Sequence, residues 1–244
     1  MTKEVEQMKI AVIGAMDEEV ELLKSKIDDR IDEEIGGAFF HRGHIDQQEI
    51  VLVKSGIGKV NAAISTAILI HQFQPDVVIN TGAAGGFNPE LEVGDVVISN
   101  EVRYNDVDAT VFGYEYGQVP QMPARYVADE SLIQIAKEAV KEEGLSVFEG
   151  LILSGDSFMN NEEKIKFLKS SFQDPQCAEM EAGAIAQVCY RFDIPFVVIR
   201  SLSDIAGKDA RESYDQFLEK AAVHSANVVL KMIHSLKTSK DRNV

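Results

Sequence analysis

The sequence predicts a single-domain, three-layer α/β protein with a central twisted β-sheet flanked by helices. Short β-branched runs alternate along the chain with longer segments whose apolar residues recur at helical spacing, which is the pattern of βα units around a largely parallel sheet. Most of the short runs are continuously apolar, and strands of this kind are buried on both faces. We therefore expect helices on both sides of the sheet. A chain of 244 residues is within the range of one such domain.

Composition and charge exclude several classes of protein. The chain is 45% apolar and 26% charged, as in ordinary globular domains. A formal net charge of −16 argues against nucleic acids and anionic membranes as partners, because both are bound through basic patches. No run approaches the ~20 apolar residues of a membrane span, and the acidic start "MTKEVEQ" is unlike a signal peptide. With only Cys177 and Cys189, and no disulfide expected, the chain is predicted to be cytoplasmic.

The first half of the chain contains four expected strands and one expected helix. Ile10–Gly14 is an apolar run that leads into the acidic stretch "AMDEE". Lys59–Phe73 has apolar residues every three or four positions and is followed by Pro75, so a helix is expected there. The other strands are expected at Ile50–Ser55, Val77–Thr81 and Asp95–Ser99.

The second half follows the same alternation. Apolar runs predict two strands, and helical spacing predicts four helices, the last of which has a long apolar stripe suited to core packing. The strands are expected at Leu151–Ser154 and Phe196–Ser203, and the helices at Asp129–Glu143, Glu162–Leu168, Met180–Phe192 and Tyr214–Leu236.

One long segment has no regular period. Arg103–Arg125 mixes aromatic residues, glycine and proline, and a connection of this length is uncommon in a compact domain unless it has a function. We expect it to contact a second subunit and to cover the active site. The folded domain is expected over residues 8–236, with a disordered extension at 1–7 and a frayed tail at 237–244, where "KTSKDRNV" has no helical period.

The stretches that follow the expected strands are candidates for a binding site. In an open parallel sheet, ligands bind beyond the carboxyl ends of the strands. These ends carry "AMDEE", "SGIGK", "TGAAGG", "SGDSF" and "RSLSD", so we expect the five stretches to converge on one cleft. The glycines of "NTGAAGG" allow backbone amides to approach a ligand, although such segments are often only tight turns.

Three charged residues near these ends each have two interpretations. Glu181 lies where a helix should start, so it either stabilises the helix dipole or binds vicinal hydroxyls such as those of ribose. Asp204 is either the N-cap of the last helix or a reactive carboxyl group. Arg200 lies in an otherwise apolar run and must be paired or face the cleft.

The remaining polar residues narrow the chemistry to carboxylates. His41 and His44 lack acidic or cysteine companions at metal-ligand spacing, so we expect a surface pair rather than a metal site. The three acids in "AMDEE" are consecutive. Consecutive residues of a helix are ~100° apart around its axis, so the three side chains cannot all point into the cleft. Glu19 is assigned to the cleft, with Asp17 as a cap and Glu18 solvated. An α/β protein whose carboxylates are all caps and salt bridges is the plainest alternative.

The chain contains, in this order, the stretches "IGAMDEEVELL", "KSGIGKVNAA", "NTGAAGG", "FGYEYGQVP", "SGDSFMN", "EMEAGAIA" and "RSLSD". Together these seven stretches resemble the bacterial 5'-methylthioadenosine/S-adenosylhomocysteine nucleosidases of the purine nucleoside phosphorylase/uridine phosphorylase superfamily. The resemblance covers residues 8–236 and implies a nucleoside phosphorylase-like fold with a mixed sheet, a homodimer, and no metal or cofactor. It implies hydrolysis of the N-glycosidic bond of methylthioadenosine, S-adenosylhomocysteine and 5'-deoxyadenosine in methionine salvage and the methyl cycle.

The same resemblance implies roles for individual residues. Glu19 would be the base that activates water, and Asp204 the acid that protonates adenine N7. Glu181 would hold the ribose hydroxyls, and Phe158 would stack on adenine. The other residues implied to line the substrate are Met16, Ile57, Ala83, Gly85, Met159, Met180, Arg200, Ser203 and Tyr214, with Phe112 and Pro120 coming from the partner subunit.

Two other functions stay open, a phosphorylase of the same fold and a non-catalytic nucleoside-binding protein. Asn80 and Ala83 stand where such phosphorylases carry Arg and Ser, and Glu19 would repel a phosphate dianion, so hydrolysis is favoured. To donate a proton near neutral pH, Asp204 needs a pKa raised by burial. Compared with the family, Ala83 replaces a frequent Ser and Tyr214 a usual Phe, which leaves the substrate preference open.

Overall fold

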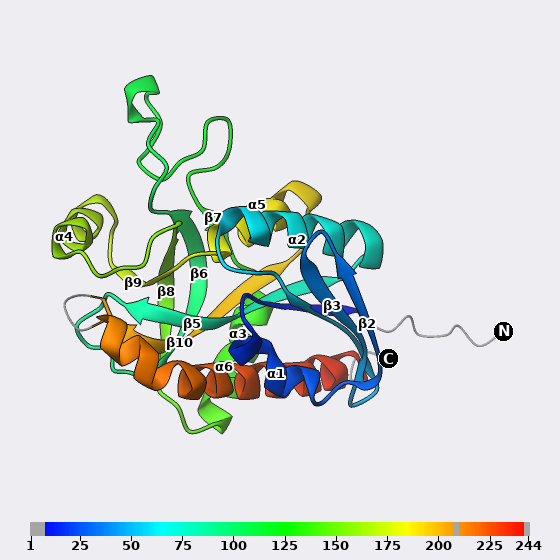
Figure 1. Cartoon of the computed structure of the whole chain (residues 1–244). Helices are drawn as coiled ribbons and strands as arrows, with labels where there is room; N and C mark the ends of the chain where they lie inside the picture. Colours follow the sequence, from blue (N-terminus) through cyan, green and yellow to red (C-terminus); the bar gives the residue numbers. More distant parts are fainter. Residues whose placement is uncertain (1–7, 207–209, 242–244) are drawn as a thin grey trace.

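The computed structural model describes residues 8–206 and 210–241, which form one three-layer α/β unit (Figure 1). The strands are β1 (Ile10–Gly14), β2 (Asp28–Ile35), β3 (Ala38–Ile45), β4 (Gln48–Lys54), β5 (Val77–Gly86), β6 (Val96–Tyr104), β7 (Tyr126–Val127), β8 (Val147–Ser154), β9 (Pro175–Glu179) and β10 (Phe196–Ile205). The helices are α1 (Asp17–Lys24), α2 (Lys59–Phe73), α3 (Glu130–Glu142), α4 (Glu162–Ser171), α5 (Ala182–Phe192) and α6 (Ala210–Asp241), with a 3-10 turn at Thr110–Phe112.

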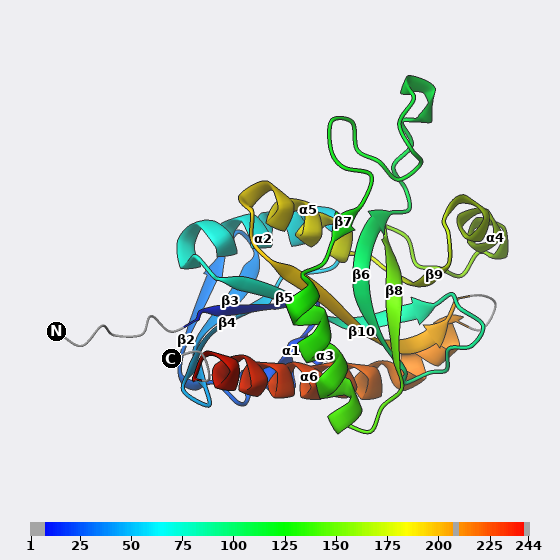
Figure 2. The same ribbon diagram turned by 180° about the vertical axis from the view of Figure 1, so that it is seen from behind.

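Helices cover both faces of the sheet. Helices α2 and α5 lie together on one face, and α1, α3 and α6 lie on the other, as the two opposite views show (Figures 1 and 2). The expectation of a three-layer fold is therefore confirmed. None of the helices within 8–206 and 210–241 is long and apolar enough to cross a membrane.

The sheet is mixed, as the family resemblance implied, and less parallel than the alternation of strands and helices indicated. Its order is β10-β6-β8-β9-β5-β1-β4-β3-β2, with a further pairing between β10 and β5. Parallel pairs join β1 to β4 and β5, β5 to β10, and β8 to β6 and β9. Antiparallel pairs join β2, β3 and β4 in a meander and also link β10 to β6, β5 to β9 and β6 to β7.

Several strands differ from the sequence prediction for identifiable reasons. Strand β2, "DDRIDEEI", is an exposed edge strand without an apolar run, and its charges suit an edge that must not pair with another chain. Strand β5 continues through "TGAAGG", predicted as a loop, because these residues pair with β10. Helix α6 extends beyond both predicted ends and includes part of the segment assigned to the tail, while residues 1–7 lie outside the described residues.

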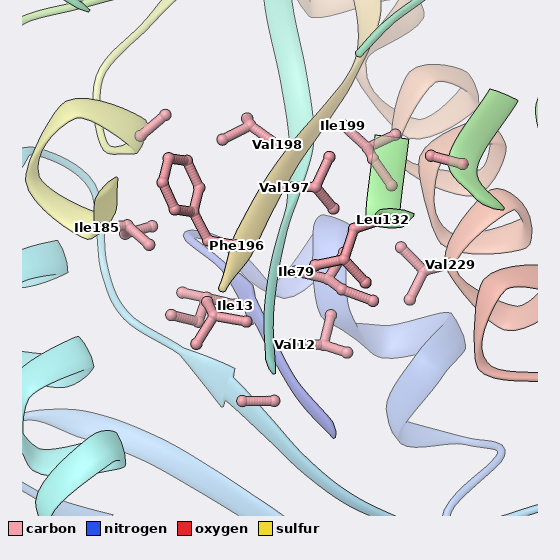
Figure 3. Packing of buried hydrophobic residues seen from close by; sticks show 14 of the residues in the cluster. Val12, Ile13, Ile79, Leu132, Ile185, Phe196, Val197, Val198, Ile199 and Val229 are labelled. Atoms are coloured by element: carbon pink, nitrogen blue, oxygen red, sulfur yellow. The ribbon is translucent and has the colours of Figure 1, made fainter. Parts of the chain in front are cut away.

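The core forms on both sides of the central strands. Val12 and Ile79 pack with Leu132 and Val229 on one face, and Ile13 lies with Phe196 and Ile185 on the other (Figure 3). These side chains are almost completely removed from water. The continuously apolar runs thus have the two-sided burial that the sequence indicated.

Two smaller predictions concern the histidines and cysteines. His41 lies directly opposite Asp32 in the β2–β3 pair, and its Nδ1 is 2.7 Å from Asp32 Oδ1. His41 is buried, so the predicted surface pair is wrong for this residue, whereas His44 is exposed. Its partner Asp32 belongs to β2, a strand that the sequence did not predict. Cys177 and Cys189 are both buried and free.

Residues 105–125, which we call the protruding segment, project from the body beside β6 and β7 (Figure 1). Apart from the short turn at Thr110–Phe112, the segment has no helix or strand, as predicted. Val111 and Phe112 at its tip are 85% and 80% exposed. Neighbouring apolar side chains that are exposed together are a feature of interaction surfaces.

Candidate active site

The ends of β1, β5, β8 and β10 and the start of α5 surround one pocket. Every residue that the sequence assigned to the substrate site of the chain's own subunit lines it, so the predicted convergence of strand ends is found. Phe112 and Pro120 lie in the protruding segment and do not line it. The lining residues are Ala15, Met16, Glu19, Ile57, Ala83, Ala84, Gly85, Ser157, Phe158, Met159, Ala178, Glu179, Met180, Glu181, Arg200, Ser203, Asp204 and Tyr214.

Glu19 is held in the pocket by backbone amides. Its Oε2 accepts hydrogen bonds from the N–H groups of Ala15 at 2.7 Å and Met16 at 3.2 Å. Its Oε1 accepts from Ala83 N–H at 2.9 Å. A carboxylate has about four acceptor positions, so Oε1 keeps one for a further donor such as water.

The other two acids of the first loop point elsewhere. Met16, not Asp17, is the N-cap of α1, so the predicted capping role of Asp17 is wrong. Asp17 instead pairs with Lys54 Nζ at 2.8 Å, a partner on β4 that the local sequence could not indicate. Glu18 is exposed, as expected. Glu19 alone faces the pocket.

The approach of Glu19 to β5 requires glycine at position 82. Gly82 has φ +153°, and a Cβ there would lie 2.2 Å from Glu19 Oε1 and 2.5 Å from Arg200 Nη1. Strand β5 pairs with β10 at this position, so the backbone cannot move away easily. The glycine-rich sequence therefore serves a close approach of a side chain to the strand rather than a turn.

We expect Gly82→Ala to lower the free energy of unfolding by roughly 2–4 kcal/mol, because it combines backbone strain with a collision. The matched control is Gly144→Ala, where φ is +70° but no atom lies within 4 Å of the new Cβ. That variant has only the backbone cost, about 1 kcal/mol. Urea denaturation measures both, and equal losses would contradict the close packing assigned to Gly82.

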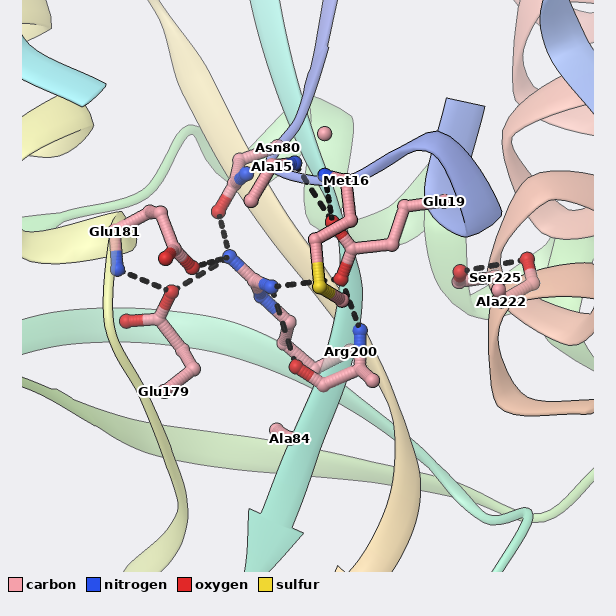
Figure 4. A network of polar contacts seen from close by, with 12 residues as sticks. Ala15, Met16, Glu19, Asn80, Ala84, Glu179, Glu181, Arg200, Ala222 and Ser225 are labelled. Atoms are coloured by element: carbon pink, nitrogen blue, oxygen red, sulfur yellow. Dashed lines mark hydrogen bonds and ion pairs between the residues drawn. The ribbon is translucent and has the colours of Figure 1, made fainter. Parts of the chain in front are cut away.

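Arg200 lines the pocket and is fully buried among polar groups (Figure 4). The sequence expectation that this charge must be paired or face the cleft is met on both counts. Three carboxylates surround one guanidinium, so the cluster has an excess of acidic groups. Nη2 donates to Asn80 Oδ1 at 2.7 Å and Glu179 Oε2 at 2.6 Å, Nη1 donates to Ala83 O at 3.2 Å, and Glu181 and Glu19 oxygens lie 3.6 and 3.8 Å away.

Glu181 is turned toward the pocket rather than toward its own helix. It occupies the N-cap position of α5 without a side-chain capping bond, and its Oε1 accepts from Gly58 N–H at 2.9 Å. Burial, reinforced by the negative charge of Glu179, raises the pKa of Glu181 to about 8. A group placed only to stabilise a helix dipole would lie closer to the amides of that helix, so the hydroxyl-binding interpretation is favoured.

Asp204 lies within β10 and not at the start of α6, so it is not an N-cap. The Ser203 hydroxyl donates to Asp204 Oδ1 at 2.8 Å. Burial raises the pKa of Asp204 to about 6, although the Ser203 hydrogen bond lowers it. The expected upward shift is confirmed. A Cβ at Gly85 would lie 2.9 Å from Asp204 Oδ2, so glycine keeps this carboxyl accessible.

Aromatic and sulfur-containing side chains form the outer part of the pocket. Phe158 is 40% exposed and makes an edge contact with Tyr214 at 5.6 Å between ring centroids. The Tyr214 hydroxyl lies 3.5 Å from Met16 Sδ. The face of a partly exposed aromatic ring suits stacking against a planar base.

Comparison with known proteins identifies the family. A sequence model described as "Phosphorylase superfamily" matches residues 9–234. A relative from Halalkalibacterium halodurans, named 5'-methylthioadenosine/S-adenosylhomocysteine nucleosidase, is 62% identical over 228 residues, which are 93% of this chain and 99% of that protein. The chain belongs to this nucleosidase family.

Two solved structures of this nucleosidase family have the same fold. The protein from Colwellia psychrerythraea, solved in complex with adenine, is 48% identical with a TM-score of 0.92, over 95% of this chain and 96% of that chain. The protein from Neisseria meningitidis, solved with methylthio-immucillin-A, is 46% identical with a TM-score of 0.91, over 93% of this chain and 99% of that chain. The likeness thus spans the elements that carry the pocket.

Ala83 and Tyr214, which the sequence analysis expected to depart from the nucleosidase pattern, make different contacts in the structure. Ala83 holds Glu19 through its backbone N–H, so a change of side chain there leaves this contact in place. Tyr214 adds a hydroxyl group beside Met16, at the edge of the pocket. Of the two, Tyr214 is therefore the one whose side chain adds a polar contact.

Sequence reasoning missed Glu179. Its Oε2 accepts from Arg200 and from the N–H groups of Glu181 and Ala182 at 2.9 and 2.8 Å, so Glu179 performs the capping that Glu181 does not. The residue ends β9, a short strand that the pattern did not indicate. The only signal in the sequence is that Glu179 is the first residue of "EMEAGAIA", one of the stretches that resemble the nucleosidases.

Proposed function

We propose that this protein hydrolyses the N-glycosidic bond of 5'-methylthioadenosine and S-adenosylhomocysteine, and of 5'-deoxyadenosine, releasing adenine and the sugar. The observation that carries the proposal is the pair Glu19 and Asp204 in one pocket. One carboxyl group is held by amides and a nearby guanidinium, and the other has a raised pKa. Two carboxyl groups in such different environments suit a base and an acid.

Activation of the attacking water is assigned to Glu19. Water that donates to the open position on Oε1 loses a proton to the carboxylate as its oxygen bonds to C1 of the ribose. The sugar passes through an oxocarbenium-like state, as in other glycoside hydrolyses that use two carboxyl groups. Arg200 Nη1 lies 3.8 Å from the same oxygen, Glu19 Oε1.

Protonation of the leaving group is assigned to Asp204. Breaking the bond between C1 and N9 places an electron pair on adenine, and protonation at N7 by Asp204 neutralises this charge. Phe158 would stack on the base, and the backbone of Met159 would bind its edge. Glu181 would hold the ribose hydroxyls with Met180 beside it, and Ile57 would line the alkylthio side.

A phosphorylase of the same fold is the alternative, and the pocket is poorly suited to it. A phosphate dianion beside Glu19 would meet a carboxylate whose neighbours include two more acids around Arg200. Asn80 is already bonded to Arg200 and to the carbonyl of Ile13. Adenine release from methylthioadenosine should proceed in phosphate-free buffer with free methylthioribose as product. A requirement for phosphate and a sugar 1-phosphate product would establish the alternative.

The pH dependence should report the acid. A general acid acts only when protonated, so kcat/KM is expected to fall as the pH rises through about 6, the pKa of Asp204. In Ser203→Ala, the hydrogen bond that lowers this pKa is lost, and the alkaline limb should move to higher pH. Ser201→Ala is the matched control, because Ser201 bonds to Gly94 O instead. A limb that does not move in Ser203→Ala would contradict the assignment of Asp204.

The protein is further proposed to be a cytoplasmic homodimer that acts in methionine salvage and the methyl cycle. Exposed apolar side chains support the dimer: Val60 and Ile64 on α2 are 69% and 45% exposed, and Phe112 is 80% exposed. With a second copy against this surface, Phe112 and Pro120 would cover the partner's pocket. Analytical ultracentrifugation tests the assembly, and a monomer at assay concentrations would contradict it.

A further inference from the structure

We infer that Asp106 is a positioning residue for adenine binding. It ties the base of the protruding segment to α2 and to residues 155–161 between β8 and α4, which we call the adenine loop. The inference rests on the proposed function. Asp106 does not line the pocket, and nothing in its sequence surroundings marked it. Its contacts place it at the junction of three segments that are far apart in the chain.

Asp106 joins Lys59 and Asp156 in a compact cluster. Both of its carboxylate oxygens are 2.7 Å from Lys59 Nζ, and its Oδ2 accepts from Asp156 N–H at 3.0 Å. Asp156 returns the contact, since its Oδ1 accepts from Lys59 N–H at 2.8 Å. Each of the three residues therefore contacts the other two.

The two partners of Asp106 lead directly to nucleoside-binding groups. Asp156 is two residues before Phe158 and three before Met159, which line the adenine side of the pocket. Lys59 is the first residue of α2, and the N–H of Gly58 before it donates to Glu181. The start of α2 thus holds the adenine loop through the N–H of Lys59 and the Glu181 carboxyl group through the N–H of Gly58.

The turn that carries Asp156 packs against the base of the protruding segment. A Cβ on Gly155 would lie 2.1 Å from Asn105 Oδ1, and Asn105 N–H donates to Ser154 O at 2.8 Å. On the other side, Gly155 N–H donates to Glu179 O at 3.1 Å. The turn is held between the base of the protruding segment and β9, so its position depends on both.

The cluster differs from an ordinary surface ion pair. The Lys59 and Asp106 side chains are 23% and 21% exposed, but Asp106 as a whole residue is exposed, so the ion pair alone contributes little to stability. The backbone N–H groups of Lys59 and Asp156 add charge-assisted hydrogen bonds with fixed geometry. Asparagine at position 106 keeps one acceptor oxygen where two now accept, so the contacts with Lys59 Nζ and Asp156 N–H cannot all be retained.

The expected effect is on binding rather than on the chemical step. Glu19 is held by Ala15, Met16 and Ala83, and Asp204 by Ser203, and none of these contacts involves the cluster. Displacement of the adenine loop weakens the binding of the substrate and the binding of the transition state equally. Such a change raises KM and leaves kcat near its original value.

The test is Asp106→Asn, with Asp108→Asn as the matched control. Asp108 is two residues away and, like Asp106, exposed; within residues 8–206 and 210–241 it accepts hydrogen bonds from Thr110, in its own loop. In Asp106→Asn, KM for methylthioadenosine and the Kd for adenine should rise roughly 10- to 100-fold, with kcat within about twofold. Asp108→Asn should behave as the unsubstituted protein. If Asp106→Asn does not fold, Lys59→Gln is measured instead, with the same expectation.

The outcomes separate this inference from the proposed function. A KM within twofold of the unsubstituted value, or a fall in kcat with KM unchanged, would overturn the role of Asp106. An equal change in Asp108→Asn would also overturn it, because the effect would then belong to the whole loop. If the unsubstituted protein released no adenine, the proposed function itself would fail.

Discussion

Replacing Asp204 with asparagine is expected to lower kcat for adenine release by roughly 100- to 10,000-fold, the range that one general acid contributes. Asparagine has nearly the same shape and can still accept from the Ser203 hydroxyl, but its amide cannot deliver a proton at the pH of the assay. Adenine would then have to leave as an anion. Steady-state kinetics with methylthioadenosine measure the loss.

Binding and stability should change little in the same variant. Asp204 makes its side-chain hydrogen bond with its neighbour Ser203, so the pocket is expected to keep its shape. Because burial disfavours the charged carboxyl, a neutral amide there removes a cost rather than a contact. A kcat within tenfold of the unsubstituted value, with normal folding, would remove Asp204 as the acid.

The second large effect is expected for Glu19→Gln, which should lower kcat by roughly 100- to 10,000-fold through loss of the base. Glutamine also places an NH₂ group against an N–H donor, since both Glu19 oxygens accept from backbone amides. Part of the loss will therefore come from misplacement. Glu19→Ala, which lacks both the base and the misplaced donor, should show a comparable loss of adenine release.

The neighbouring Glu18→Gln is the matched control for Glu19→Gln. Glu18 carries the same group on the same turn of α1 but is exposed to solvent. Its variant should retain activity, and Glu19→Gln should still bind adenine as measured by calorimetry. Equal rates for the two variants would contradict the assignment of the base to Glu19.

Much of the fold was predictable because its central strands are buried on both faces. Runs such as Ile10–Gly14 have a composition that only a covered strand accommodates, and that strand is found as predicted. Edge and short strands lack this signal. The charged strand β2 and the five-residue β9 are determined by pairing with distant segments, which a local pattern does not contain.

The candidate site was predictable for a similar reason and failed in similar places. Glu19 follows β1 and Asp204 is next to the last residue of β10, so the strand-end rule located them, whereas Arg200 was located as a lone charge in an apolar run. The role of Asp17 was predicted wrongly because its partner, Lys54, is on β4 and far away in the sequence. Glu179 and Asp106 were not predicted, because their contacts depend on how segments distant in sequence pack together. The roles of Phe112 and Pro120 stay predictions, since they require a second copy of the chain.

The central claim is that Glu19 directs a water molecule at C1 of the ribose while Asp204 protonates adenine. A single turnover of methylthioadenosine in ¹⁸O-water without phosphate tests it most directly, with rapid borohydride reduction of the sugar before its C1 oxygen can exchange. Free methylthioribose incubated for the same time controls for exchange. We expect one ¹⁸O atom at C1 for each adenine released. An unlabelled C1 oxygen, or no adenine from the folded protein, would contradict the account.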